Sequence, residues 1–593
     1  MRALLRIVAV SFSVLIAAGC VALHRPSRRV ERRALESIDR SRAAHLETRE
    51  PFALPPAEAE WRREWGLPLP PARGTGDAGA VWRAQTNALH LSLIDALQVA
   101  ARGNAAYQDL KEAVFRAALA LEQEQAGFRN SFETALRLQL SGDEGEADEE
   151  PERGTRSSVE LGLSRELWQG ATFEANLAAD MARLLTADRD SSFGIMADVS
   201  VSIPLLQNAG SDVALEPLRQ AERDTVYAIY ELERYKKQLA IRVASQYFST
   251  LQASDQRENA LRNYHALTES RRRVERLAEA GRMSGIQVDQ ARQDELSARE
   301  RWMRAGYRAE AALDTFKVFV GVPPEMKLSL DEGALARVAT TINDTTAEIR
   351  TIGAGAVSNA NAFAAGEGIA IPVAVTNDAP LRAVTPTEAV TLALENRLDR
   401  RTSLGRIEDA VRKVAVAARA VPGGLDLSAG LESGARRTVN NAAQDDAKPD
   451  LDEASYRIEM EWDLPWERTD EAAVYRRRRV EHARAVRQCR ETEHTIIRQV
   501  RDAYRRVLQA LESCRIQDEA VQLAERRVSS TELFLAAGRI QVRDVLEARD
   551  ALLSAQNALT AARIDYTVAL LELQRDMGLL WVTDKGICSQ YER

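Results

Sequence analysis

The chain has 593 residues, of which 28% are charged, and its formal net charge is −8 with both signs interspersed. This balance gives no indication of a nucleic-acid partner, which would favour clustered basic residues. The six histidines and four cysteines are scattered along the sequence, so the sequence predicts neither a metal site nor a disulfide scaffold.

The start of the chain resembles the signal of a bacterial lipoprotein. Two arginines precede a short apolar run over residues 7–18, which is too short to cross a bilayer as a helix and is typical of a signal-peptide core. Small residues then lead directly to Cys20, as in the motif at which such signals are cut and acylated, for example with palmitate. A plain secretory signal with an incidental cysteine is the alternative. We expect removal of residues 1–19 and lipidation of Cys20. Because Val21 is not the Asp that retains lipoproteins in the inner membrane, we expect sorting to the outer membrane.

A first repeat is expected at residues 87–330, after an N-terminal region, 20–86, that contains many Arg and Pro residues. Apolar and polar residues alternate over 158–167 and 193–206. This period of two predicts strands with one apolar and one polar face, which suits a barrel wall between lipid and water. Residues 168–180 contain more strand-like sequence, and the sequence leaves open whether they add a strand.

A second repeat is expected at residues 381–582. It follows an insert, 331–380, that is rich in small residues, and it precedes a short tail, 583–593. Its alternating stretch, 456–462, predicts another strand. That strand ends just before Pro465, because proline cannot donate to a strand ladder and is tolerated where a helix begins.

Each repeat also predicts a hairpin of very long helices. Residues 218–280 and 467–537 contain no Gly or Pro, and a typical helix is only about 11 residues long. A glycine, Gly281 or Gly538, then opens a turn, after which the helical pattern resumes. Apolar residues recur every seven positions in the last helix, which is typical of a coiled-coil seam.

The two hairpins are copies of one another. Residue i of the first matches residue i + 257 of the second without insertion or deletion, which chance would not maintain. The matching pairs include Val243 and Val500, Tyr247 and Tyr504, Leu251 and Leu508, Gly281 and Gly538, Ala291 and Ala548, Ala298 and Ala555, and Gly321 and Gly578.

Polar loops separate the predicted strands of each repeat, at residues 141–157 and 438–453, and we expect both to be solvent-exposed and mobile. On the helices alone, a long helical bundle or spectrin-like rod is an equal alternative. The alternating strands decide against it, because a rod has no use for them.

The order of these elements resembles the TolC-type outer-membrane efflux proteins, over about residues 91–581. The motifs that carry the resemblance are the helix openings at 94–100 and 387–393, the strand end at 204–210 and the turn at 538–548. The resemblance implies an α+β fold in which tandem helical hairpins form an α-barrel tunnel. It also implies a homotrimer in which each protomer gives four strands to one shared transmembrane antiparallel β-barrel.

The resemblance further implies that the channel lies in the outer membrane, with its helical part in the periplasm. A periplasmic adaptor, or membrane fusion protein, and an inner-membrane pump would dock on its closed tip. The implied tip contacts are Gly281, Arg282, Met283, Gly538, Arg539 and Ile540.

The resemblance also places Asp544 and Glu547 at the pore constriction, as rings of carboxylates that attract cations. Both acids share one helix face, and we expect substitutions there to cost little stability because they are exposed. An ordinary acidic turn, neutralised by Arg543 and Arg549, is the alternative. In the first repeat Gln287 stands at the position of Asp544.

No nucleophile elbow, phosphate loop or catalytic triad is found, so we expect neither an enzyme nor a bound cofactor. The leading hypothesis is a passive exit duct of a tripartite efflux or secretion system for drugs, other small molecules or proteins. The alternative is a structural coiled-coil envelope lipoprotein without channel activity. The sequence identifies neither the pump nor the exported substrate.

Overall fold

A computed structural model describes residues 29–46, 51–54, 89–142, 153–184, 191–207, 209–340, 369–371, 382–439, 442, 444–463, 466–537, 539–583 and 586–589. The chain divides into two compact units. One consists of Met1–Ala53, Ala113–Ile229 and Thr402–Cys489, and the other of Leu54–Glu112, Tyr230–Arg401 and Arg490–Arg593. The long helices α7 and α13 contribute to both units, so each unit contains parts of both repeats.

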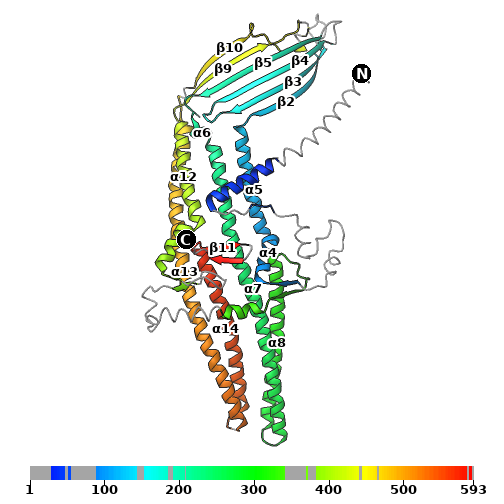
Figure 1. The fold of residues 1–593 in the computed structure, drawn as a ribbon, viewed down its shortest axis with the longest axis vertical. Helices are drawn as coiled ribbons and strands as arrows, with labels where there is room; N and C mark the ends of the chain where they lie inside the picture. The colour runs from blue at the N-terminus through cyan, green and yellow to red at the C-terminus, as the bar shows by residue number, and fades with distance from the viewer. Residues whose placement is uncertain are drawn as a thin grey trace, which may run out of the picture. The chain divides into compact units, whose positions relative to one another are not determined.

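The first unit is built on a six-stranded antiparallel sheet in the order β10-β9-β5-β4-β3-β2 (Figure 1). Its strands are β2 (Ser131–Gly142), β3 (Arg153–Glu166), β4 (Thr172–Leu184), β5 (Ser191–Pro204), β9 (Gly424–Gly434) and β10 (Ser455–Asp463). The predicted strands at 158–167, 193–206 and 456–462 correspond to β3, β5 and β10.

The sheet has one apolar and one polar face, because side chains alternate along every strand. One row of the apolar face crosses all six strands: Phe132, Leu163, Ala175, Val199, Leu431 and Tyr456. The opposite face carries charged and amide pairs between neighbouring strands. Arg137 donates to Glu160 at 2.9 Å, Arg156 to Asp180 at 2.9 Å, and Asn176 to Asp198 at 3.0 Å.

One expectation about this sheet is wrong, and another holds only in part. The chain contributes six strands rather than the four that the resemblance implies, because residues 168–180 fall largely in β4 and the first repeat supplies four strands of its own. The loop over 438–453 is also not wholly exposed. Its described residues include Val439 and Ala442, which are 7% and 1% exposed.

Helices α5 (Ala105–Gly127) and α12 (Leu398–Arg419) precede β2 and β9 along the chain, and α7 (Glu216–Glu279) and α13 (Thr469–Ala536) follow β5 and β10. Each of these four helices has residues in both units. The short α6 (Ser211–Ala214) precedes α7. The bounds of α7 and α13 confirm the two predicted long helices. Their burial patterns leave charged faces, and no described helix is long and apolar enough to cross a membrane.

In the second unit, each repeat opens with a short strand and a capped helix. Strand β1 (Leu89–Leu91) pairs in parallel with β6 (Leu328–Leu330), and α4 (Leu93–Gly103) follows. Strand β8 (Arg382–Val384) pairs with β7 (Ile369–Ile371) and precedes α11 (Pro386–Asn396). Both helices begin with a capping box, Ser92 with Asp95 and Thr385 with Glu388, which satisfies amide groups that a helix start otherwise leaves unpaired.

The hairpins of the second unit are α7 with α8 (Gly285–Val320) and α13 with α14 (Val542–Asp576). A small hairpin of β11 (Leu580–Thr583) and β12 (Gly586–Ser589) follows α14. The duplication extends to buried hydrogen bonds. Tyr247 donates to the Leu91 carbonyl at 3.3 Å and Tyr504 to the Val384 carbonyl at 3.1 Å, so each long helix is joined to the strand that opens its own repeat.

Candidate pore constriction and helix tips

The two hairpins turn by the same backbone geometry. Gly281 has a positive φ of 70°, which favours glycine, and the Arg282 amide donates to the Leu277 carbonyl at 2.8 Å. At the matching place in the second hairpin, the Arg539 amide donates to the Phe534 carbonyl at 3.0 Å. Gly538 itself lies outside the described residues.

The predicted tip residues differ in their accessibility. Arg282 and Arg539 are exposed. Met283 and Ile540 are half-buried and pack against one apolar cluster formed by both hairpins. That cluster consists of Leu267, Val274, Ala291, Ala298, Leu535, Val542, Val545 and Leu546. The arginines are therefore available to a partner, whereas Met283 and Ile540 help to hold the hairpins together.

The two predicted pore acids also differ. Glu547 is exposed, whereas Asp544 is half-buried in the first turn of α14. The Asp544 carboxylate accepts a hydrogen bond of 3.0 Å from the amide of Gln541, the residue that precedes the helix. Asp544 therefore caps α14, which was not expected from its position in an exposed acidic turn.

This capping role explains why Gln287 stands at the matching position. Its side-chain oxygen accepts from the Ser284 amide at 3.2 Å, and Ser284 immediately precedes α8. An amide oxygen and a carboxylate oxygen can both accept this hydrogen bond. The two repeats thus share the cap and differ only in the charge that it carries.

We expect Asp544→Ala to destabilise the protein by about 1 kcal/mol, because the Gln541 amide loses its acceptor. Asp544→Gln should cost less, since it reproduces the cap of the first repeat. Glu547→Ala, which removes an exposed acid, should change stability by less than about 0.5 kcal/mol. Denaturant unfolding of the three variants would measure these differences, and equal losses for Asp544→Ala and Glu547→Ala would contradict the capping role.

Polar contacts join the hairpins above the tips. Arg301 of α8 donates to Asp550 of α14 at 2.9 Å. Asn259 of α7 donates to Asn557 of α14 at 3.1 Å, and Thr560 donates to Asp255 at 2.9 Å. These pairs cross between the two repeats, so they couple the copies that the duplication produced.

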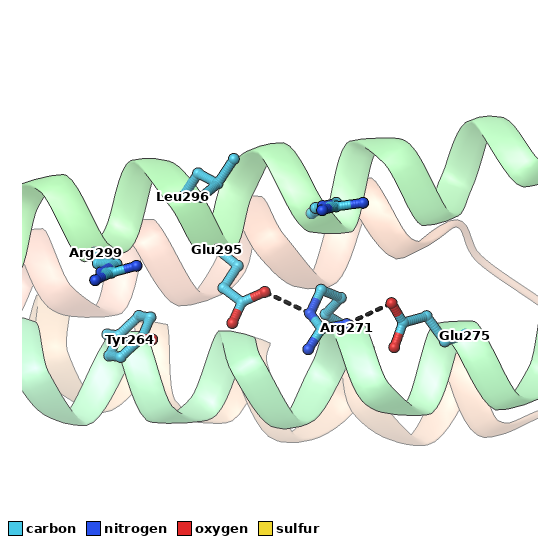
Figure 2. Close-up of a pocket in the computed structure, with 7 residues that line it drawn as sticks. Tyr264, Arg271, Glu275, Glu295, Leu296 and Arg299 are labelled. Atoms are coloured by element: carbon cyan, nitrogen blue, oxygen red, sulfur yellow. Dashed lines mark hydrogen bonds and ion pairs between the residues drawn. The ribbon is translucent and has the colours of Figure 1, made fainter.

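A charged groove of about 340 Å³ lies between α7 and α8, and sequence reasoning missed it. Figure 2 shows Arg271 between Glu275 and Glu295, with which it forms ion pairs. Thr268 also donates to Glu295 at 3.0 Å. Because Arg271, Glu275 and Glu295 are paired with one another, these three side chains contribute to the packing of the hairpin itself. Arg292 and Arg299 also line the groove. The signal that could have found it is the pairing of Arg271 with an acid four positions further along α7.

Within the described part of the chain, no group of His, Cys, Asp and Glu is arranged to hold a metal ion. Burial raises the pKa of the Cys514 thiol to about 11, which makes it a poor nucleophile at neutral pH. Cys20, the predicted lipidation site, lies outside the described residues.

Comparisons with known proteins agree with this architecture. Residues 389–579 match the family model described as outer membrane efflux protein. No curated protein matches the chain in sequence. Among solved structures, CusC is 11% identical with a TM-score of 0.56, and the match covers 82% of this chain and 92% of CusC.

Two further channels are similar in structure. The CmeC outer membrane channel of Campylobacter jejuni is 14% identical, with a TM-score of 0.54 over 84% of this chain and 87% of CmeC. The open MtrE outer membrane channel of Neisseria gonorrhoeae is 12% identical, with a TM-score of 0.55 over 82% of this chain and 88% of MtrE. Residues 389–579 are therefore similar to the outer membrane efflux proteins, and 82–84% of the chain shares the fold of solved outer-membrane channels.

Proposed function

We propose that this chain is the outer-membrane exit duct of a tripartite efflux or secretion system. The family match and the fold support a channel over the alternative of a structural coiled-coil lipoprotein. The observation that carries the proposal is the sheet with one apolar and one polar face, because such a wall can separate lipid from an aqueous lumen.

The exposure of the apolar face supports assembly from several copies. In the row that crosses all six strands, Val199 and Leu431 are 40% and 43% exposed, whereas Phe132 and Tyr456 on the edge strands are 77% and 82% exposed. Unpaired strand edges are templates for another chain. A strand of a second copy beside each edge would cover these side chains and complete the backbone ladder.

The number of strands also permits closure. Because six antiparallel strands alternate in direction, β10 of one copy and β2 of the next would run antiparallel. A homotrimer would then have a barrel of three times six strands. Barrel diameter grows roughly linearly with strand number, and barrels of about 16–18 strands leave an aqueous channel.

The remaining parts have roles within this proposal. The helical hairpins would form the periplasmic tunnel, and exposed Arg282 and Arg539 would meet a periplasmic adaptor that also engages an inner-membrane pump. Asp544 and Glu547 would line the entrance. A lipid on Cys20 would anchor the chain to the outer membrane. The helix over residues 29–46 is held near α5 by Arg33, which donates to Glu122 at 3.1 Å.

Neighbouring residues on opposite faces of β10 provide a test. Ile458→Lys places a charge on the apolar face, where it should cost about 2–4 kcal/mol per copy at the bilayer midplane. The matched variant Glu459→Lys changes the polar face and should be tolerated. We expect the first to reduce strongly the yield of membrane-inserted trimer that conducts in planar bilayers, and the second to leave that yield unchanged. Equal yields, a monomer, or a trimer without conductance would contradict the duct.

A further inference from the structure

The chain between β9 and β10 folds back over the polar face of the sheet. Gly434 has a positive φ of 87° and turns the chain away from β9. A Cβ added to Gly194 of β5 would overlap the Ala435 carbonyl, and one added to Gly154 of β3 would overlap the methyl groups of Val439. Both glycines lie on the polar face, so the segment crosses that face in direct contact with it.

The far end of this segment is fixed to β5 by its backbone. The Ile195 amide donates to the Ala447 carbonyl at 2.8 Å, and the Ala447 amide donates to the Phe193 carbonyl at 2.9 Å. The Asp446 carboxylate accepts from the Phe193 amide at 2.8 Å. We call residues 435–447, considered through their described members, the strap.

The strap contacts the hairpin formed by β3 and β4. Arg436 forms ion pairs with Glu160 of β3 and, at 3.5 Å, with Asp180 of β4. The Asp180 side chain is fully buried and is also paired with Arg156. The second repeat contributes two strands to the six-stranded sheet, β9 and β10, whereas the first contributes four. In chain order β2 corresponds to β9 and β5 to β10, so β3 and β4 are the strands of this sheet without a counterpart. The strap therefore contacts β3 and β4, the two strands of the sheet that have no counterpart in the second repeat.

The strap is stiffened from within and covers the surface below it. Arg437 is 7% exposed and donates to the Asp445 carbonyl at 3.2 Å. The polar-face residues of β3, β4 and β5 beneath it are almost inaccessible, which is unusual for the water-facing side of a sheet. They are Ser158, Ala178, Asp180, Ala182 and Ser192.

We propose that the strap is a second constriction of the duct, inside its barrel and at the end remote from the helices. The added hairpin β3–β4 widens the barrel, and one strap from each copy, carrying Arg436, narrows it again and selects solutes by size. This inference rests on the proposed function, because it requires the polar face to line the lumen. It places the constriction at the outer end, since β5 begins at Ser191 beside the strap and ends at Pro204, next to the helices.

A cysteine placed on the helix side of the strap can report whether a reagent from outside passes the strap. Ser200 lies on the polar face of β5, nearer to the helices than the strap. Ser200→Cys in the full chain, in intact cells, would be treated from outside with a small maleimide or with a maleimide on a long polyethylene glycol chain. The chain without Ser200→Cys corrects for labelling of other cysteines. We expect only the small reagent to react.

Arg436→Glu should release the strap, because it sets a carboxylate against Glu160 and Asp180. We then expect the size discrimination at Ser200→Cys to be lost. Arg457→Glu makes the same charge change on the polar face of β10, outside the strap, and should preserve the discrimination. A disulfide between Gly154→Cys and Val439→Cys, formed before labelling, should hold the strap in place and restore the discrimination in the Arg436→Glu chain.

The outcomes separate this inference from the proposed function. Reaction of the large reagent with the Ser200→Cys chain in which Arg436 is intact would overturn the strap while leaving the duct. The same conclusion would follow if Arg436→Glu and Arg457→Glu behaved alike. Failure of even the small reagent to reach Ser200→Cys in every variant would contradict a water-filled lumen, and with it both proposals.

Discussion

Arg412→Met is expected to destabilise the sheet-bearing unit by about 3–5 kcal/mol, the cost of leaving a buried charge without its partner. Arg412 of α12 donates to Glu216 at 2.6 Å and pairs with Asp409 at 3.0 Å. Glu216 and Asp409 are only 9% and 5% exposed. Removing the guanidinium therefore leaves the buried Glu216 carboxylate without its ion-pair partner. Asp409, by contrast, keeps the hydrogen bond of 2.6 Å from the Tyr227 hydroxyl and the ion pair of 4.0 Å with Arg223.

The matched control is an exposed ion pair between the same two helices. Arg223 of α7 donates to Glu408 of α12 at 2.6 Å, but both side chains are substantially exposed. Glu408→Gln should cost at most about 1 kcal/mol, because surface ion pairs contribute little. Thermal unfolding followed by circular dichroism measures both variants. Similar losses of stability for Arg412→Met and Glu408→Gln would show that the buried ion pairs of Arg412 contribute no more than an exposed pair.

The helical architecture could be predicted from the sequence because its signals are local and repeated. The absence of Gly and Pro gave the extent of α7 and α13 to within two residues at each end. Because the two hairpins match at a constant offset of 257 residues, the helical pattern found in one hairpin could be checked against the sequence of the other. The turn at Gly281 could be predicted because glycine adopts a positive φ more readily than other residues do.

The sheet could be predicted only in part. Strands β5 and β10 alternate strongly. Strand β9 also alternates, with Leu425, Leu427 and Leu431 on the apolar face, but sequence reasoning did not assign it. Strand β4 gives a weaker signal, because Ala178 and Ala182 stand on its polar face. The resemblance therefore implied the wrong number of strands in the sheet, four instead of six.

The strap and the ion network could not be predicted, because their partners are far apart in sequence. Arg436 and Glu160 are separated by 276 positions, and Arg412 and Glu216 by 196. No local pattern indicates such pairs. The cap at Asp544 is different, since its partner Gln541 is only three residues away and the spacing is that of a capping box.

The double variant Asp544→Gln/Glu547→Gln is expected to lower the cation selectivity of the duct strongly and to weaken block by trivalent cations. In a trimer, these two acids would place six carboxylates around the periplasmic entrance, and charge rings of one sign in a narrow opening concentrate counter-ions. Glutamine is the substitution of choice at residue 544 because Gln287 performs the same cap in the first repeat. A change in conductance can then be attributed to charge rather than to a frayed helix.

Single-channel recording in planar bilayers would compare this variant with the unmodified protein and with Glu310→Gln. Glu310 is an exposed acid of α8, about 37 Å of helix beyond the start of α8 at Gly285, so its loss removes one charge far from the tip. Unchanged selectivity and trivalent block in Asp544→Gln/Glu547→Gln would reject the carboxylate ring. The duct would survive that result, because in the first repeat a neutral side chain already caps the same turn.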